Sequence, residues 1–208
     1  MNIRNKSLPY PNKFKNIAIT DAMDIFEVLA KVEANDKYHT IIIDSLTFLM
    51  DMFETQYVIT ATNTQKAWGE YAQYFKRIMQ DFVAQSSKRI VFTAHTMDVL
   101  SETEQVYKTY VKLKGSLMNY GVEANFTTVI ATKRLPLTKL EAYKNDLLTI
   151  TDREKRLGFK HVFQTELTKE TVNERIRSPL NMWTDDETYI DNDMQLVFDR
   201  LDKFYNGN

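Results

Sequence analysis

The sequence contains no cysteine and only five glycines among its 208 residues. Without cysteine, the chain cannot form a disulfide or a thiolate metal site. No apolar run approaches the roughly 20 residues that a membrane-spanning helix needs, and residues 1–16 lack the apolar core of a signal peptide. We therefore expect a cytoplasmic protein that has no membrane partner.

The most informative absence is that of a phosphate-binding loop. The motif G-x-x-x-x-G-K-[ST] holds nucleotide phosphates with backbone amides and a lysine. Glycine stands at positions 69, 115, 121, 158 and 207, and none of these positions belongs to such a motif. Because the amides and the lysine supply most of the phosphate-binding energy, we expect the chain alone to bind ATP poorly.

Length and charge limit the remaining possibilities. A chain of 208 residues suits one domain that can bury a core. We therefore expect a single domain over 1–208, in which residues 1–16 form an irregular lead-in. The formal net charge is -1, so the chain as a whole does not attract nucleic acid or membranes. Any contact with DNA has to use a local patch.

Apolar periodicity predicts alternating helices and strands, and hence an α/β fold with three layers and a mostly parallel sheet. Helices are expected over 21–34, 46–59, 65–85 and 193–205. Strands are expected over 39–44, 89–94 and 126–132. Residues 97–125 are expected to form a long loop and 135–157 a polar, partly helical stretch. A C-terminal β-hairpin, formed by 161–167 and 171–176, is expected at one edge of the sheet.

Two of the predicted strands end on polar side chains. Asp44 and Ser45 follow a run of three isoleucines, and His95 and Thr96 follow the strand over 89–94. Ligands of open α/β sheets collect at the carboxyl ends of the strands, so these four side chains are expected to share one rim. A rigidly held carboxylate suits the outer coordination shell of Mg²⁺. The alternative is that these polar residues only terminate their strands.

The order of these segments resembles that of a known family. The run TIIIDSLTFL, followed by WGEYAQYFKRIMQDFVAQSSKRIVFTAH and KLKGSLMNYGVEANFTTVI, is similar to the RecA-like P-loop ATPases. It is most similar to the phage-encoded recombination ATPases related to RecA, UvsX and the single-strand-annealing group. The resemblance implies ATP and Mg²⁺ as ligands and Asp44 as the Walker B acid. It also implies that Ser45 and Thr96 support the nucleotide and that His95 senses its phosphate, while no general base can be assigned.

A pair of arginines extends this resemblance. Arg175 and Arg177 lie two residues apart in ERIRSP, so on a strand their side chains point the same way. RecA-like ring proteins carry such a basic pair on a late strand, where it reaches the nucleotide of the neighbouring subunit. The resemblance therefore implies that both arginines stabilise phosphate charge across an interface. The alternative is a solvated strand face on which nearby glutamates balance the arginines.

Basic residues alternate with aromatic residues in the segment 100–121. This composition suits single-stranded DNA, because lysines contact phosphates and bases stack on aromatic rings. RecA-like proteins carry DNA-binding loops after the corresponding strands, which agrees with this position. The alternative is a solvated loop in which Glu102 and Glu104 offset the lysines. The residues that we expect to contact DNA are Lys108, Lys112, Lys114 and Tyr120.

The resemblance places the phosphate-binding loop upstream of Asp44, where this sequence shows none. We therefore expect an incomplete RecA-like ATPase domain, completed by an upstream P-loop segment or chain. Such a domain would couple ATP hydrolysis to DNA binding or annealing in a phage-type recombination or replication system. We expect it to form a homo-oligomeric ring or filament in the cytoplasm of the bacterial host. Two alternatives stay open: a catalytically inactive assembly subunit on the same fold, and an unrelated α/β enzyme that binds another small ligand at the rim.

Overall fold

The computed structural model describes residues 14–207, which form two compact units. The first unit comprises the described residues up to Met97 together with Tyr110–Val122, and the second comprises Asp98–Thr109 together with the described residues from Glu123 on. Most of the lead-in expected over 1–16 lies outside the described residues, and 14–16 have no regular structure. That the two units together make up one domain stays a prediction.

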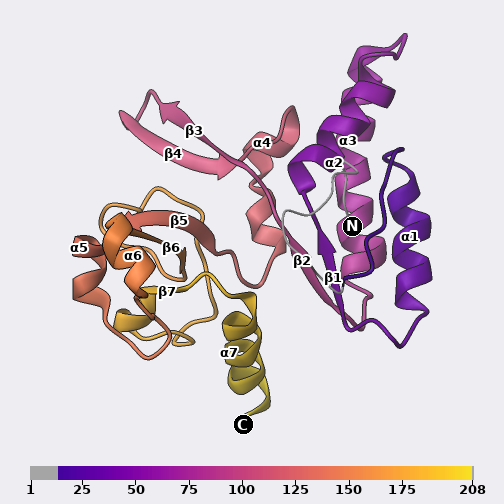
Figure 1. Ribbon diagram of the computed structural model, residues 1–208. Coiled ribbons are helices and arrows are strands. Elements are labelled where there is room, and N and C mark those ends of the chain that lie inside the picture. Colours follow the sequence, from indigo (N-terminus) through magenta and orange to yellow (C-terminus); the bar gives the residue numbers. More distant parts are fainter. Residues whose placement is uncertain (1–13, 208) are drawn as a thin grey trace. The chain divides into compact units, whose positions relative to one another are not determined.

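The first unit contains a parallel pair of strands, β1 (Thr40–Ile43) and β2 (Arg89–Phe92). Figure 1 shows this pair beside the helices α1 (Asp24–Glu33) and α3 (Thr64–Arg77). The side chains of Ile41 and Ile43 are buried, as a strand covered by helices requires. The strands predicted over 39–44 and 89–94 are therefore confirmed.

The helices predicted for the first unit are also confirmed, although two of them change their winding near the C-terminal end. Helix α2 (Leu46–Phe53) continues as a π-helix over Glu54–Val58, and α3 continues as a π-helix over Ile78–Val83. The apolar stripe that predicts α3 faces the core of this unit. Of the six residues in this stripe, Tyr71, Phe75, Ile78 and Met79 are buried, while Trp68 and Phe82 are partly buried.

The segment after β2 is structured, so the prediction of a long loop over 97–125 is wrong. Strands β3 (Thr96–Ser101) and β4 (Val106–Val111) pair as a hairpin, and a short helix, α4 (Ser116–Tyr120), and a 3-10 turn over Val122–Asn125 follow. No residue over 96–111 is fully buried. The hairpin therefore lacks the run of buried apolar residues by which a strand is recognised from sequence.

The second unit contains a three-stranded antiparallel sheet. Its strands are β5 (Ala131–Pro136), β6 (Phe159–Gln164) and β7 (Tyr189–Asp191), in the order β5-β6-β7. The strand expected over 126–132 is thus displaced toward the C-terminus. An α/β fold is confirmed, but the described residues form small separate sheets, parallel and antiparallel, in place of one mostly parallel sheet.

The predicted C-terminal hairpin of 161–167 with 171–176 is wrong. β6 pairs with β5 and β7, and residues 171–176 form no strand. The buried side chain of Gln164 gives the physical reason, because its Nε2 donates to Glu166 O at 2.7 Å and to Thr171 Oγ1 at 2.8 Å. These bonds fold the chain after β6 into turns, so it cannot pair back along the strand.

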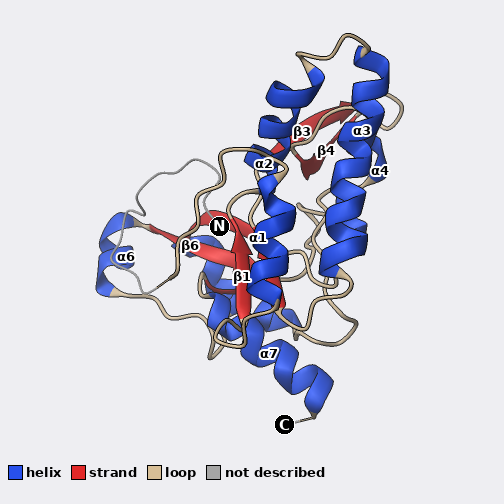
Figure 2. Cartoon of the chain, turned by 90° about the vertical axis from the view of Figure 1, so that its right-hand side faces the viewer, coloured by secondary structure: helices blue, strands red, loops and turns tan. Residues whose placement is uncertain are grey.

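Helices complete the second unit. In the sequence, the short helices α5 (Leu137–Leu140) and α6 (Asp152–Leu157) come between β5 and β6. Helix α7 (Met194–Asn206) runs to the C-terminal end (Figure 2). Asp193 caps α7 by accepting a hydrogen bond from Gln195 N at 2.9 Å, which confirms the helix predicted over 193–205. Within residues 14–207, no helix is both long enough and apolar enough to cross a membrane.

Candidate functional site

Asp44 directly follows β1 and turns its carboxylate to solvent. Its neighbours Ile43 and Ser45 are buried, with 0% and 3% of their surface exposed. The Thr93 hydroxyl, at the end of the neighbouring strand, donates a hydrogen bond to Asp44 Oδ1 at 2.7 Å. The peptide bond between Asp44 and Ser45 is cis. The core thus holds the backbone on both sides of an accessible carboxylate.

Further hydrogen bonds join the two strand ends. Thr93 N donates to Ile43 O at 3.1 Å, and Leu46 N donates to Thr93 O at 2.8 Å. Two residues further on, His95 N donates to Thr47 Oγ1 at 2.9 Å. The segments after β1 and β2 therefore lie side by side, and the polar residues that follow the two strands share one rim.

Ser45 has a visible structural role in this rim. It is the N-cap of α2, and its hydroxyl accepts a hydrogen bond from Phe48 N at 3.4 Å. An N-cap satisfies a backbone amide that has no partner inside the helix. Ser45 therefore starts α2 directly behind the Asp44 carboxylate, and its contact with a nucleotide stays a prediction.

His95 and Thr96 lie at the start of the β3–β4 hairpin. The His95 ring packs edge-on against Phe48, with ring centroids 4.8 Å apart, and its backbone carbonyl accepts from Lys112 N at 2.8 Å. His95 and Thr96 are both exposed. The hydrogen bond that the Asp44 carboxylate accepts in this region comes from the hydroxyl of Thr93. The predicted contacts of His95 and Thr96 with a nucleotide stay predictions.

The sequence pattern indicates the stretch 93–95 as the rim partner of Asp44, but it assigns no role to Thr93 itself or to Thr47. The parallel register pairs Ile43 with Phe92, so the next residue of each strand is Asp44 on one side and Thr93 on the other. If the strands that end at Ile43 and Phe92 are assumed to end at the same level, Asp44 and Thr93 are predicted to lie next to each other. Thr47 shows no such signal, because a threonine in the first turn of a helix is common and only the fold brings it to His95.

The donor set at the rim fits Mg²⁺ held through water. Mg²⁺ in nucleotide sites keeps several waters and uses one or two carboxylates together with the phosphates. Asp44 can provide such a carboxylate. Within residues 14–207, no group of three or more histidine, aspartate or glutamate side chains is arranged to hold a metal by itself. A metal ion at Asp44 would therefore depend on phosphate oxygens for its remaining ligands.

The predicted arginine pair belongs to the second unit. Arg175 and Arg177 are exposed and flank the buried Ile176. They do not lie in a regular strand, because only a single bridge joins Arg177 to Val129. Glu174 forms an ion pair with Lys133. The role of the arginines across a subunit interface stays a prediction.

The residues expected to contact DNA differ in their surroundings. Lys108 forms an ion pair with Glu104. Lys114 donates to both carboxylate oxygens of Glu54, at 2.9 and 2.7 Å, and these bonds raise the pKa of its ammonium. Lys112 is exposed, and Tyr120 is 53% exposed. Contact with DNA stays a prediction.

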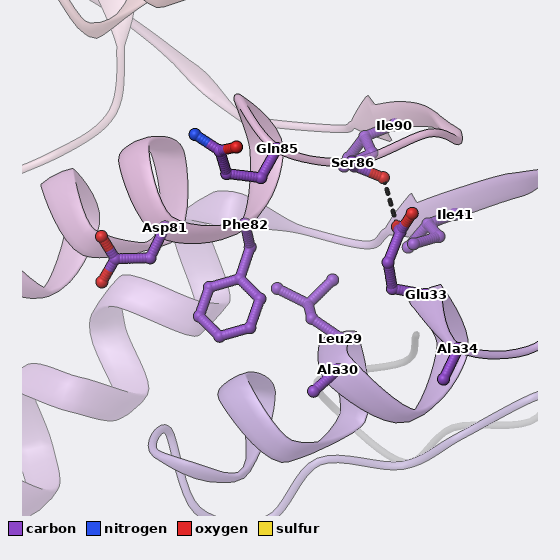
Figure 3. Close-up of a pocket in the computed structure, with 10 residues that line it drawn as sticks. All are labelled: Leu29, Ala30, Glu33, Ala34, Ile41, Asp81, Phe82, Gln85, Ser86 and Ile90. Atoms are coloured by element: carbon purple, nitrogen blue, oxygen red, sulfur yellow. Dashed lines mark hydrogen bonds between the residues drawn. The ribbon is translucent and has the colours of Figure 1, made fainter.

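A groove of about 360 Å³ in the first unit lies apart from these residues (Figure 3). It contains none of the predicted site residues. Its polar lining includes the carboxylates of Glu33 and Asp81 but no lysine or arginine, so it does not suit a phosphate. Hydrogen bonds from Ser86 and Ser87 lower the pKa of Glu33 to about 2, which keeps it charged. The apolar lining residues are Leu29, Ala30, Ala34, Ile41, Phe82 and Ile90.

Comparison with known protein families assigns most of the chain to one of them. A family model described as an AAA domain matches residues 5–155, which is more than half of the chain. The matched span contains Asp44, Thr93 and His95 and ends before Arg175. No curated protein and no solved structure matches significantly.

Proposed function

The chain belongs to the AAA domain family, whose members are nucleotide-binding and ATPase-like, and from this premise we propose that it supplies the magnesium-binding rim of a nucleotide-dependent ATPase. One observation carries the proposal. The Asp44 carboxylate is exposed directly after parallel strand β1 and accepts a hydrogen bond from Thr93, the residue that follows β2. A carboxylate in this position suits the water shell of a Mg²⁺ ion that also binds phosphate.

Each residue of the rim has a distinct part in this proposal. Mg²⁺, when bound, neutralises phosphate charge. Asp44 accepts hydrogen bonds from the water ligands of the ion, and Ser45 starts the helix behind it. His95 and Thr96 face the terminal phosphate from the adjoining segment. Arg175 and Arg177 act on the nucleotide of a neighbouring subunit in a homo-oligomeric ring or filament.

This sequence contains no phosphate-binding loop motif, so another segment or another chain would have to supply the loop. β1 and β2 form a two-stranded sheet among the described residues, and the unpaired edge of such a sheet can accept a further strand. We propose that an upstream segment or a second chain adds a parallel strand and its phosphate-binding loop. This addition would extend the pair into the three-layer RecA-like core expected from the sequence.

We further propose that the ATPase acts on single-stranded DNA in a phage-type recombination or replication system. The resemblance to phage recombination ATPases and the basic, aromatic composition of 100–121 support this part. Lys112 and Tyr120 are exposed, while Lys108 and Lys114 would have to exchange their glutamate partners for phosphates.

A second candidate function is a catalytically inactive assembly subunit on the same fold. The absence of a G-x-x-x-x-G-K-[ST] motif from the sequence favours it, because a subunit that only pairs with active partners does not need the loop. It differs from the first candidate in one measurable property, because Mg²⁺-dependent nucleotide binding at Asp44 is expected only of the first.

Titration of the ¹⁵N-labelled chain with ATP, with and without Mg²⁺, tests the proposal, since NMR detects weak binding. We expect the amide signals of 43–47 and 93–96 to shift, and Mg²⁺ to strengthen binding. Asp44→Asn should weaken the Mg²⁺-dependent part roughly 10-fold or more, the range that metal-site partners show. Asp98→Asn is the matched control, because Asp98 is also exposed and also accepts a threonine hydroxyl, from Thr109 at 2.7 Å.

The possible outcomes separate the two candidates. An equal Mg²⁺ dependence in the wild type and in Asp44→Asn would show that Asp44 is not the metal carboxylate. No response of the rim to ATP and Mg²⁺, even when the upstream segment is added, would favour the assembly subunit.

A further inference from the structure

Thr93 makes three hydrogen bonds to the segment around Asp44. Its amide donates to Ile43 O, its carbonyl accepts from Leu46 N, and its hydroxyl donates to Asp44 Oδ1. We infer that Thr93 is a positioning residue that fixes the orientation of the Asp44 carboxylate for metal binding. This inference rests on the proposed function, and it gives Thr93 a specific role that neither the sequence pattern nor the family match assigns.

The geometry explains how one hydroxyl can orient a carboxylate. An aspartate side chain at the surface can rotate, and each alternative orientation points its oxygens away from a metal. A hydrogen bond to a charged acceptor is stronger than a neutral one. The bond from Thr93 holds Oδ1, so Oδ2 is left to face solvent and the water shell of an ion.

The donor in this pair is itself rigid. Backbone hydrogen bonds at 3.1 and 2.8 Å hold Thr93 on both sides of its Cα atom. Threonine is branched at Cβ, which restricts its rotamers and suits it to a strand end. Groups that hydrogen-bond a metal ligand without touching the metal have large effects on metal affinity, because they remove alternative orientations of that ligand.

Two substitutions distinguish the effect of the Thr93 hydroxyl from the effect of the shape of its side chain. Thr93→Val keeps the branched shape and removes the donor, whereas Thr93→Ser keeps the donor and removes a methyl group. The Thr109–Asp98 pair provides a control of the same chemistry, since its hydroxyl donates to a carboxylate at the same distance of 2.7 Å. Thr109→Val therefore removes an equivalent hydrogen bond in the β3–β4 hairpin, away from the ends of β1 and β2.

The test uses Mn²⁺ as a paramagnetic probe for Mg²⁺, added to the full ¹⁵N-labelled chain in the presence of ATP. Bound Mn²⁺ broadens the signals of nearby amides, so its position is read directly and without any turnover. In the wild type we expect broadening at 44–47 and 93–96. In Thr93→Val the Mn²⁺ concentration that gives half of the broadening should rise roughly 10-fold or more. Thr93→Ser and Thr109→Val should stay close to the wild type.

Broadening in Thr93→Val equal to that of the wild type would overturn the positioning role and leave the role of Asp44 intact. An equal loss in Thr93→Ser and Thr93→Val would also overturn it, because shape and not the hydroxyl would then be responsible. Unchanged broadening in Asp44→Asn would overturn the proposed metal site itself, and the inference with it. If Thr93→Val does not fold, comparing Thr93→Ala with Thr93→Ser decides the same question.

Discussion

Lys160→Met should destabilise the second unit strongly, because Lys160 is a buried cation between two carboxylates. Its Nζ lies 2.7 Å from Glu154 Oε1 and 3.1 Å from Asp191 Oδ1, and only 8% of the side chain is exposed. Methionine has a similar length and keeps the apolar packing of the stem. The substitution therefore removes mainly the charge and its hydrogen bonds.

The size of the effect follows from burial. Removing one partner of a buried ion pair costs about 3–5 kcal/mol, because the other charge is left uncompensated. Glu154 and Asp191 keep 20% and 29% of their side-chain surface exposed, so water relieves part of this cost. We expect a loss of about 2–3 kcal/mol. For a folding unit of about 100 residues, this loss lowers the Tm by roughly 10–20 °C.

The same substitution has a predictable pH dependence. Burial alone would raise the pKa of Glu154, but hydrogen bonds from Lys160 and Thr151 outweigh burial and lower the pKa from 4.5 to about 2. A lowered carboxyl pKa gives stability that is present above the ordinary pKa and is lost as the pH falls through the lowered one. The difference between the wild type and Lys160→Met should therefore be full at neutral pH and shrink between pH 4.5 and about 2.

Urea unfolding followed by circular dichroism at neutral pH and near pH 3 measures this difference. Lys155→Met is the matched control, since Lys155 pairs with Asp152 at 3.0 Å but the two side chains are 63% and 86% exposed. We expect this control to cost less than about 0.5 kcal/mol. The reasoning is wrong if the two substitutions cost the same at neutral pH, or if the cost of Lys160→Met does not change with pH.

Two further substitutions test other parts of the chain. Gly115→Ala should cost about 1–3 kcal/mol, because Gly115 has a φ of +60° and a Cβ there would lie 3.1 Å from Trp68 Cε3. Gly69→Ala, inside α3 with nothing within 4 Å, should instead stabilise by about 0.5–1 kcal/mol in the same urea assay; equal costs would contradict the strain. Lys112→Ala should weaken binding of a labelled single-stranded oligonucleotide in fluorescence anisotropy and reduce the salt slope by about 0.7. Lys114→Ala should weaken it less, because Glu54 neutralises that lysine, and the reverse order would count against the assignment.

Local patterns in the sequence were sufficient for the elements of the first unit up to β2. Strands β1 and β2 are short aliphatic runs bounded by polar residues, and α1, α2 and α3 carry apolar residues at helical spacing. The rim itself was also predictable. Residues that follow two neighbouring parallel strands meet at one edge of the sheet, so the sequence predicts that Asp44 and His95 lie close together.

The antiparallel elements were not predictable in the same way. The β3–β4 hairpin buries no residue fully, so its sequence does not carry the contrast that marks a strand. β6 had an evident strand pattern, but its partners β5 and β7 lie far away in the chain. Strand pairing over such distances depends on packing and on turns such as those around Gln164, which local pattern does not specify.

The sequence by itself therefore determined which segments of the first unit up to β2 are helices and strands and where its exposed acid lies. These properties depend on side chains that are neighbours in the chain. Only the tertiary structure decided that Thr93 bonds the Asp44 carboxylate, that Glu54 neutralises Lys114 and that β6 pairs with β5 and β7. These outcomes depend on hydrogen bonds and ion pairs between residues far apart in sequence, which form only when the core brings their backbones together.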